Sequence, residues 1–438
     1  MYYFIGIKGT GMAALALIMH DLGYKVSGSD KEDHFFTEDP LVERKIPIYP
    51  FDVNNIKEGM IIVQGNAFRD DHEEVVRAKD LGLKIYSYQE MVGKLTKMFK
   101  TIGISGCHGK TTTTSMMAHV LDSIRGSNYL IGDGTGSANK ENEYFALEAC
   151  EYKRHFLAYS PYYAVITNIE LDHIDYYKDI DDVILAYEQY ANRAEKMIIA
   201  CGDDPYTHSL NVDKPIFFYG LDDHNDIIAK DVEFRDDGTS FDVFVEGNYY
   251  GHFDLPLYGK HMLLNSLAVI SVCYYERIDA KEVSKYLKTF RGAKRRFKEK
   301  EIGDIVTIDD YAHHPTEVKV TIKGARQKYP NKEIVAVLLI HTYSRAAKFT
   351  NEFVEALNLA DKAYVMDVYV DRKEDIEPFD CHEIIKRLDN GEYINNDMAD
   401  KLLVHENAVI IFMSSKEIYV LQKAYEEKLK EKQKNEAK

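Results

Sequence analysis

The amino-acid sequence predicts an α/β protein built from three consecutive blocks with largely parallel sheets. Short apolar runs alternate with helical patterns almost throughout the chain, which favours strand–helix–strand units. Two glycine-rich turns each follow an apolar run and precede a helical pattern. The length of 438 residues also suits about three domains.

The first block, residues 1–98, starts with an apolar run that leads into a glycine-rich turn and a helical pattern. Strands are predicted at 2–7, 60–64 and 84–87, and a further strand after the first helix ends at Asp30. The helix is predicted at 12–22. This order of strand, turn, helix and strand is typical of nucleotide-binding domains.

The second and third blocks, residues 99–297 and 298–438, continue the alternation. In the second we predict a helix at 110–121, strands at 100–105, 144–149, 163–168 and 197–201, and an antiparallel ribbon at 240–245 and 249–255. In the third we predict strands at 305–309, 334–339, 363–368 and 408–413, and helices at 316–328 and 346–359. The charged tail, 426–438, is expected to be a fraying helix end.

Composition and charge exclude several classes of protein. The 55 basic and 72 acidic side chains give a net charge of −17, which argues against nucleic acid or an anionic membrane as a partner. No run approaches the roughly 18 apolar residues of a spanning helix. The chain starts without a basic export region, and its 5 cysteines follow no pattern, so we expect a cytoplasmic protein without a disulfide framework.

The first glycine-rich turn is Gly6-Ile7-Lys8-Gly9-Thr10-Gly11. Its G-x-x-G-x-G spacing is the reverse of the dinucleotide fingerprint, which favours a nucleotide diphosphate other than NAD. Asp30 ends the second predicted strand, where an acid that binds ribose would lie. The alternative is a tight turn that merely requires glycines.

The second glycine-rich turn is Gly106-Cys107-His108-Gly109-Lys110-Thr111. It is shorter than a full Walker loop, because Ile104 occupies the position of the first glycine. We predict ATP binding: backbone amides cradle the phosphates, Lys110 reaches the β- and γ-phosphates, and the Thr111 hydroxyl binds Mg²⁺. An ordinary polar helix cap is the alternative.

Acidic and imidazole side chains follow two later strands. Glu151 comes after one apolar run, and the turn from Asn168 to His173 follows the next. Ligands bind outside the carboxyl ends of parallel strands, so Glu151 and His173 are predicted to lie beside the second glycine-rich turn and to bind Mg²⁺. For Asp172 or Asp175, a helix cap before Tyr176 is the favoured alternative.

Two further patterns leave alternatives open. His261 and Asn265 lie one helical turn apart, where they suit either an adenine or phosphate edge or a structural cap. The basic run Lys294-Arg295-Arg296 lies at a block junction, where it suits either anion binding or a solvated face.

The chain resembles the Mur ligases of peptidoglycan synthesis along almost its whole length. The resemblance rests on an ordered set of motifs: Gly106-x-His108-Gly109-Lys110-Thr111, Thr167-Asn168-Ile169-Glu170-x-Asp172-His173, His261-x-x-x-Asn265, Lys294-Arg295-Arg296-Phe297 and Asp309-Asp310-Tyr311-Ala312-His313-His314-Pro315. It is most similar to the subclass that adds L-alanine. No lysine occurs between Lys178 and Lys196, whereas the other subclasses have a carbamylated lysine downstream of the metal-binding histidine.

The resemblance implies three domains: a Rossmann-like domain for a UDP substrate, a central P-loop ATPase-type α/β domain, and a C-terminal Rossmann-like domain for the amino acid. It implies cytoplasmic, ATP- and Mg²⁺-dependent joining of L-alanine to the muramoyl carboxylate of UDP-N-acetylmuramate through an acyl phosphate. The implied partners are these small molecules, with the protein a monomer or homodimer.

The resemblance also implies roles for individual residues. The UDP substrate would contact Gly6, Gly9, Thr10, Gly11, Asp30, Asn66 and Asn168. ATP would contact Gly106, Cys107, His108, Gly109, Lys110, Thr111, Thr112, His261, Asn265 and Asp310. Thr111 and Glu151 would hold one Mg²⁺ and His173 a second. The implied catalytic set is Lys110, His173, Arg295, Arg296, His313, His314, His341 and Arg345.

Two departures from the family pattern lie in the C-terminal block. Leu339-Ile340 stands where the family usually has Gln-Pro, and Ser414-Ser415-Lys416-Glu417 replaces a glycine-rich turn that ends in Asp. They leave the identity of the amino acid open, so that a different amino acid or a peptide is an alternative acceptor. A non-catalytic nucleotide-binding homologue is a further alternative, against which the intact Lys110, Thr111, Glu151 and His173 argue. Cys107, at a helix start near Lys110, is predicted to be either a reactive thiol or an inert loop residue.

Overall fold

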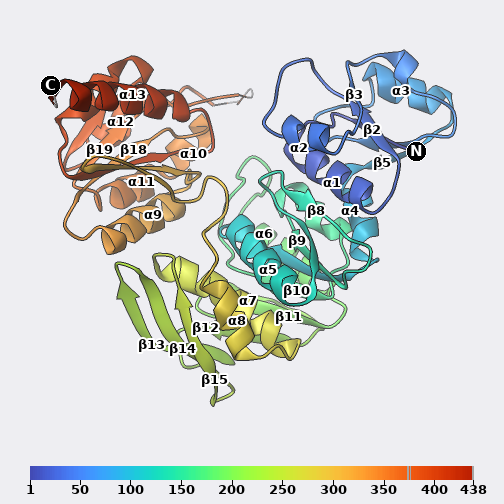
Figure 1. Cartoon of the computed structure of the whole chain (residues 1–438), viewed down its shortest axis with the longest axis horizontal. Coiled ribbons are helices and arrows are strands. Elements are labelled where there is room, and N and C mark those ends of the chain that lie inside the picture. The colour runs from blue at the N-terminus through green and yellow to red at the C-terminus, as the bar shows by residue number, and fades with distance from the viewer. Residues whose placement is uncertain (372–373, 375, 437–438) are drawn as a thin grey trace. The chain divides into compact units, whose positions relative to one another are not determined.

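The computed structural model describes residues 1–371, 374 and 376–436 (Figure 1). It contains three mixed or parallel sheets of five, ten and six strands with helices between them, so the predicted α/β class is confirmed. No helix among the described residues is long and apolar enough to cross a membrane. The predicted helical tail belongs to the last helix as far as position 436, and positions 437–438 lie outside the described residues.

The N-terminal sheet is parallel and has the strand order β3-β2-β1-β4-β5. Its strands are β1 (Tyr2–Ile5), β2 (Val26–Ser29), β3 (Ile48–Tyr49), β4 (Ile61–Gln64) and β5 (Lys84–Ser87). The helices are α1 (Thr10–Asp21), α2 (Glu38–Glu43), α3 (Glu73–Asp80) and α4 (Tyr88–Thr96), with a 3-10 turn η1 (Val53–Asn55).

Alternation along β1 divides the core of this domain between the two faces of the sheet. Phe4 packs in one apolar cluster with α1 and α4, whereas Tyr3 and Ile5 pack with Val75 and Ala78 of α3. Figure 1 accordingly shows α1 and α4 on one side of the sheet and α3 on the other. The carboxyl ends of β1 and β2 lead directly into the first glycine-rich turn and Asp30.

The ten-stranded sheet has the order β15-β14-β13-β12-β11-β10-β6-β9-β7-β8. Its strands are β6 (Lys100–Ser105), β7 (Ser127–Leu130), β8 (Gly136–Ser137), β9 (Tyr144–Glu148), β10 (Tyr163–Ile166), β11 (Met197–Cys201), β12 (Ile216–Gly220), β13 (Ile227–Arg235), β14 (Gly238–Val245) and β15 (Asn248–Leu255). Central strand β6 pairs in parallel with β9 and β10, so the residues after these three strands meet at one edge. Glu246 and Gly247, both at positive φ, form the two-residue turn of the predicted ribbon.

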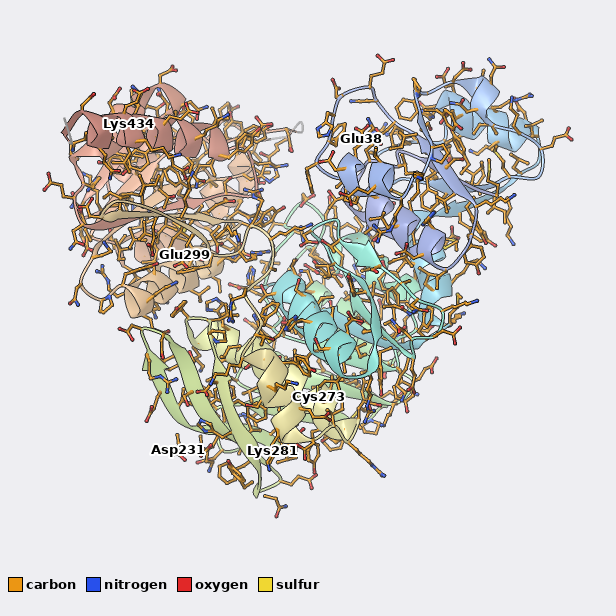
Figure 2. All side chains as sticks on the ribbon, viewed as in Figure 1. Glu38, Asp231, Cys273, Lys281, Glu299 and Lys434 are labelled. Atoms are coloured by element: carbon orange, nitrogen blue, oxygen red, sulfur yellow. The ribbon has the colours of Figure 1, made fainter. Side chains whose placement is uncertain are left out.

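The helices of this region are α5 (Lys110–Arg125), α6 (Ile180–Ala191), α7 (Lys260–Tyr275) and α8 (Ala280–Leu287). The remaining short turns are η2 (Tyr152–Ala158) and η3 (Thr207–Ser209). Cys273 of α7, labelled in Figure 2, is fully buried, as expected of an apolar packing residue rather than a disulfide partner.

The C-terminal sheet has the order β16-β17-β21-β18-β19-β20, in which only β16 is antiparallel to its neighbour. Its strands are β16 (Lys298–Ile302), β17 (Ile305–Asp310), β18 (Glu333–Leu338), β19 (Lys362–Val365), β20 (Gly391–Tyr393) and β21 (Ala408–Met413). Its helical elements are α9 (Pro315–Lys328), α10 (Tyr343–Lys348), α11 (Thr350–Leu357), α12 (His382–Ile385), η4 (Asn396–Val404) and α13 (Tyr419–Glu436). The single helix predicted at 346–359 is therefore wrong: the backbone of Phe349 leaves helical geometry and separates α10 from α11.

The chain forms two compact units. The first comprises Met1–Lys230, Asp242–Phe253 and Leu264–Phe290, and the second comprises Asp231–Phe241, Asp254–Leu263 and Arg291–Lys438. The two glycine-rich turns both belong to the first unit. The predicted domain boundaries at 98/99 and 297/298 stay predictions.

Candidate active site

The first glycine-rich turn joins β1 to the start of α1. Gly6 has a φ of +83°, and a Cβ there would lie 2.1 Å from the ring of Phe68, so only glycine fits. Gly9 is the N-cap of α1 and supplies no side-chain cap, which leaves the first backbone amides of the helix to bind an anion. Thr10 and Gly11 open the helix itself.

Asp30 stabilises this turn by hydrogen bonds to backbone amides. One of its oxygens accepts the backbone amide of Lys8 at 2.7 Å, and the other accepts that of Lys31 at 2.8 Å. The ammonium of Lys8 in turn donates to the carbonyls of Lys31 and Asp33, both at 3.0 Å, and pairs with Glu38 at 2.8 Å. The loop after β2 is thereby fastened to the turn.

The other predicted substrate contacts lie in different surroundings. Asn66 is exposed in the turn after β4, the strand next to β1. Asn168 instead lies against the second glycine-rich turn, where its oxygen accepts the His108 amide and its amide group donates to the His108 carbonyl, both at 2.9 Å. Asn168 therefore shapes the second glycine-rich turn, which is predicted to bind ATP.

The second glycine-rich turn is tightly enclosed. Gly106 has a φ of +143°, and a Cβ there would lie 1.9 Å from the Thr167 hydroxyl oxygen. Gly109, at a φ of +83°, caps α5 without a side chain, and a Cβ there would lie 2.7 Å from the buried Asn265. The amides at the start of α5 therefore face a cradle built for an anion, followed by Thr111 and Thr112.

A buried ionic cluster lies beside this cradle. The Lys110 ammonium donates to the carbonyls of Gly106 at 2.6 Å and Cys107 at 3.1 Å, and pairs with Glu151 at 2.9 Å. His173, held at a φ of +51°, approaches Glu151 at 3.4 Å. Burial opposes the charge on both partners, but the attraction prevails: the pKa of Glu151 is lowered and that of Lys110 is raised.

Glu148, the last residue of β9, is a site residue that the sequence analysis missed. Its two oxygens accept the Thr111 hydroxyl at 3.1 Å and the Gly132 amide at 2.7 Å. The sequence indication was its position at the end of an apolar run, three residues before Glu151. Glu148 touches the predicted metal-binding hydroxyl directly, whereas Glu151 contacts Lys110 and His173.

The donor set fits Mg²⁺ and a nucleotide triphosphate. Two carboxylates, a hydroxyl and an imidazole surround the start of α5, and oxygen-rich sets of this kind suit Mg²⁺ when phosphate and water complete the shell. The two glycines without room for a Cβ keep the amides accessible to phosphate. A second Mg²⁺ at His173 stays a prediction.

In the C-terminal unit, the predicted basic residues gather around Tyr311. The guanidinium groups of Arg295 and Arg296 lie 5.4 and 4.9 Å from its ring centre. Arg295 also donates to the Ser414 carbonyl at 3.1 Å, and Arg296 lies 3.5 Å from Glu317. These contacts hold both arginines at the carboxyl end of β17.

The histidines that follow β17 have structural partners. His313 approaches Glu317 at 3.0 Å, and its ring nitrogen lies 3.0 Å from the Tyr311 carbonyl. His314 is 1% exposed, caps α9 in a reciprocal capping box with Glu317, and packs edge-on to Phe349. Both histidines thus also fix the start of α9.

Asp310 is buried at the end of β17, where its oxygens accept the amides of Phe297 and Ala312, both at 2.8 Å. Burial raises its pKa to about 6, against the attraction of Arg296. The folded state therefore binds an extra proton between the ordinary pKa of 3.8 and about 6. Stability from this group is highest below this window and falls as pH rises through it.

We expect the substitution Asp310→Asn to remove this dependence. The unfolding free energy of the variant, relative to that of the wild type, should rise by about 2 kcal/mol between pH 4 and pH 7. Urea unfolding across that range measures it, with the exposed Asp389→Asn as the matched control. A difference that stays constant with pH contradicts the prediction.

His341 and Arg345 lie after β18, beside two residues that the sequence analysis did not place in the site. His341 approaches Asp371 at 3.0 Å, and Asp371 pairs with Lys416 at 2.5 Å. Burial lowers the pKa of His341, so its neutral form is favoured. Arg345 is 8% exposed and donates to the His341 carbonyl at 3.3 Å.

His261, in the C-terminal unit, is predicted to contact ATP. Burial lowers its pKa to about 4, and its Nδ1 atom has no hydrogen-bond partner among the described residues. A neutral imidazole with an orphaned nitrogen is compatible with a neutral hydrogen-bonding ligand such as an adenine edge. Its contact with ATP stays a prediction.

Cys107 is buried within the loop rather than exposed beside the phosphates. Its sulfur donates to the Glu170 carbonyl at 3.0 Å and accepts the Glu170 amide at 3.1 Å. Burial raises its pKa well above the ordinary value, despite nearby Lys110. The structure therefore favours the inert alternative.

Iodoacetamide at neutral pH is accordingly expected to leave Cys107 unmodified in the folded protein. Peptide mass mapping after brief labelling checks this, and the same chain in urea is the positive control. Modification of Cys107 in the folded protein as fast as in urea would contradict the prediction.

Comparisons with known proteins decide the family. The Mur ligase family, catalytic domain matches residues 1–100, the Mur ligase middle domain matches 104–273, and the Mur ligase, glutamate ligase domain matches 295–416. The chain belongs to the Mur ligase family. The resemblance and the three-domain α/β architecture expected from the motifs are thereby confirmed.

Three solved structures are similar to this Mur ligase. UDP-N-acetylmuramate-alanine ligase from Thermotoga maritima has 26% identity and a TM-score of 0.81, covering 98% of this chain and 99% of its own. Murein peptide ligase from Psychrobacter arcticus has 23% identity and a TM-score of 0.68, covering 98% of both chains. UDP-N-acetylmuramate:L-alanyl-gamma-D-glutamyl-meso-diaminopimelate ligase from Neisseria meningitides has 26% identity and a TM-score of 0.60, covering 67% of this chain and 99% of its own.

Family membership establishes the general chemistry. Mur ligases form an amide bond with cleavage of ATP, act in peptidoglycan synthesis, and generally use Mg²⁺. Their substrates are small molecules, a nucleotide and a UDP-sugar.

Proposed function

We propose that this protein joins L-alanine to the muramoyl carboxylate of UDP-N-acetylmuramate, in the cytoplasm, as a monomer or homodimer. The observation that carries the proposal is the buried cluster of Lys110, Glu151 and His173 at the uncapped start of α5. The first glycine-rich turn, which suits a UDP pyrophosphate, belongs to the same compact unit. The similarity to the Thermotoga maritima alanine ligase supports this acceptor.

In the first step, a muramoyl carboxylate oxygen attacks the γ-phosphorus of ATP, and ADP leaves. Lys110 and the amides at the start of α5 neutralise and orient the transferring phosphoryl group. Mg²⁺, when bound, would neutralise further phosphate charge; Thr111, Glu148 and Glu151 would hold one ion and His173 a second. Glu151 also keeps the Lys110 ammonium charged and fixed in place.

In the second step, the amine nitrogen of L-alanine attacks the acyl carbon, loses a proton, and phosphate leaves. Arg295 and Arg296 supply positive charge for the phosphate groups, and Asp310 fixes the backbone that carries them. His313, His314, His341 and Arg345 are proposed to line the space between the muramoyl carboxylate and alanine. Catalysis consists mainly of positioning and charge neutralisation.

A peptide acceptor is the second candidate. It is favoured by the two departures from the family pattern, at 339–340 and 414–417, because both lie near His341. Lys416 of the second departure pairs with Asp371, and Asp371 contacts His341. The similar Neisseria meningitides protein is named for a tripeptide acceptor. A larger acceptor would use the same ATP chemistry.

Release of ADP and phosphate with ATP, Mg²⁺ and UDP-N-acetylmuramate tests the proposal across a panel of acceptors. We expect release with L-alanine and much less with glycine or L-serine. Release only with L-alanyl-γ-D-glutamyl-meso-diaminopimelate selects the second candidate. No release with any acceptor, despite ATP binding, would indicate a non-catalytic homologue.

Glu148 gives a sharper test of the metal site. The substitution Glu148→Gln removes the charge beside the Thr111 hydroxyl, and we expect the Mg²⁺ concentration for half-maximal activity to rise by about 10- to 100-fold. Initial rates over a Mg²⁺ titration measure this. Glu143→Gln, an exposed acid that precedes the same strand and pairs with Lys100, is the control. An unchanged Mg²⁺ requirement would remove Glu148 from the metal site.

A further inference from the structure

We propose that the N-terminal domain carries a second ligand site, for a small organic anion that contains an aromatic ring. The site is a cavity of about 650 Å³, a volume within the range of small-molecule pockets. Tyr3, Ser27 and Tyr49 lie on its wall, on three adjacent strands. It is distinct from the UDP-substrate turn, because Gly6 follows the opposite, carboxyl end of β1.

The pattern of β2 explains why a cavity forms here. The strand has the sequence Val26-Ser27-Gly28-Ser29, so its apolar positions face α1 and its serines face the other side of the sheet. The apolar cluster under α3 includes residues of β1, β4 and β5 but none of β2 or β3. Beyond β1, this face therefore presents polar side chains that no apolar cluster covers.

Ser27 is the polar group that points to a ligand. It is 3% exposed, and its hydroxyl has no hydrogen-bond partner among the described residues. Ser29, on the same face, donates its hydroxyl to the buried Glu74 at 2.5 Å, and Tyr3 donates to the same carboxylate at 3.2 Å. An unsatisfied buried hydroxyl is uncommon in folded proteins, and a bound acceptor at the cavity wall accounts for it.

The charge of the wall selects an anion. Lys25 and Lys57 line the cavity together with His20, and no aspartate or glutamate among the described residues does so. Within the described ranges, neither lysine ammonium lies within ion-pair distance of a carboxylate, although the whole chain has a net charge of −17. Two lysines without acidic partners in an acidic protein favour a phosphate or carboxylate group.

The remaining wall is aromatic and apolar. Tyr24 and Tyr49 are 38% and 44% exposed, and Pro47 and Met60 lie beside them. Exposed tyrosine rings with apolar neighbours bind planar rings by stacking or edge contacts. The cavity therefore matches an anionic group on a ring better than a bare inorganic ion.

The probe for this site is phenyl phosphate, observed by NMR of the full chain with ¹³C-labelled methionine methyl groups. Met60 reports on the cavity, whereas Met12 of α1 and Met116 of α5 report on the two phosphate-binding turns. We expect a saturable shift of the Met60 signal, assigned with Met60→Leu. Phenol, which lacks the charge, and inorganic phosphate, which lacks the ring, should each bind at least about tenfold more weakly.

Paired variants test the two lysines. Lys25→Ala/Lys57→Ala should weaken binding at Met60 about tenfold or more, whereas Lys25→Arg/Lys57→Arg and the exposed Lys97→Ala should leave it near wild type. No Met60 shift up to about 10 mM phenyl phosphate overturns the proposal. Equal binding by phenol, by inorganic phosphate or by the double alanine variant also overturns it. None of these measurements depends on ligase activity. A failure of the second-site proposal can therefore be told apart from a failure of the proposed function.

Discussion

The substitution Lys110→Met is expected to reduce kcat by about 10²- to 10³-fold, because it removes the positive charge beside the transferring phosphoryl group. Lys110 is placed for this role by the carbonyls of Gly106 and Cys107 and by the carboxylate of Glu151. Steady-state rates with saturating ATP, UDP-N-acetylmuramate and acceptor measure the loss. A kcat within about threefold of wild type would exclude Lys110 from phosphoryl transfer.

The same substitution also affects folding, and a control must separate the two effects. Glu151 is 1% exposed, and the loss of its ammonium partner leaves a buried carboxylate, at a cost of about 3 to 5 kcal/mol. Lys110→Met/Glu151→Gln should recover much of this stability but none of the activity. Lys100→Met provides a comparison, because Lys100 pairs with the partly buried Glu276 at 3.0 Å within the same compact unit and has no proposed role in catalysis.

Local sequence patterns predict the parts of the site that lie within one turn. The order of strand, glycine-rich turn and uncapped helix is encoded by neighbouring residues, so α1, α5 and the two glycine-rich turns were predictable. The parallel arrangement then places Glu151 beside Lys110, although 41 positions separate them. The remaining residues of the predicted ATP site rest on the ordered motifs of the family.

Other features depend on contacts that no local pattern encodes. Glu148 and Glu151 both follow the same apolar run, and only the packing of Gly132 and Thr111 against β9 assigns Glu148 to the hydroxyl. The positions of Asp371 and Lys416 depend on how the segments after β19 and β21 approach His341. The break at Phe349 escapes prediction because the apolar periodicity continues across it from α10 into α11.

The substitution Gly106→Ala is expected to abolish detectable ATP binding. A methyl group at this position would lie 1.9 Å from the Thr167 hydroxyl oxygen and 3.1 Å from the Asn168 amide nitrogen, both in the strand-to-turn segment that shapes the loop. The backbone φ of +143° is also one that residues with a side chain rarely adopt. The loop must therefore move, and its amides then no longer converge on the phosphates. Isothermal titration with ATP and Mg²⁺ measures the loss.

Gly82→Ala is the control for Gly106→Ala. It introduces alanine at a positive φ without a steric clash, so it measures the effect of backbone strain alone. Gly82 has a φ of +62° at the end of α3, and a Cβ there would meet nothing within 4 Å. Strain at such a position costs roughly 1 to 2 kcal/mol of stability, but the change leaves the phosphate loop intact. We therefore expect Gly82→Ala to lower the melting temperature and to bind ATP like wild type. If Gly106→Ala also binds ATP normally, the enclosed loop is not the phosphate cradle, and the ATP site must be sought elsewhere in the chain.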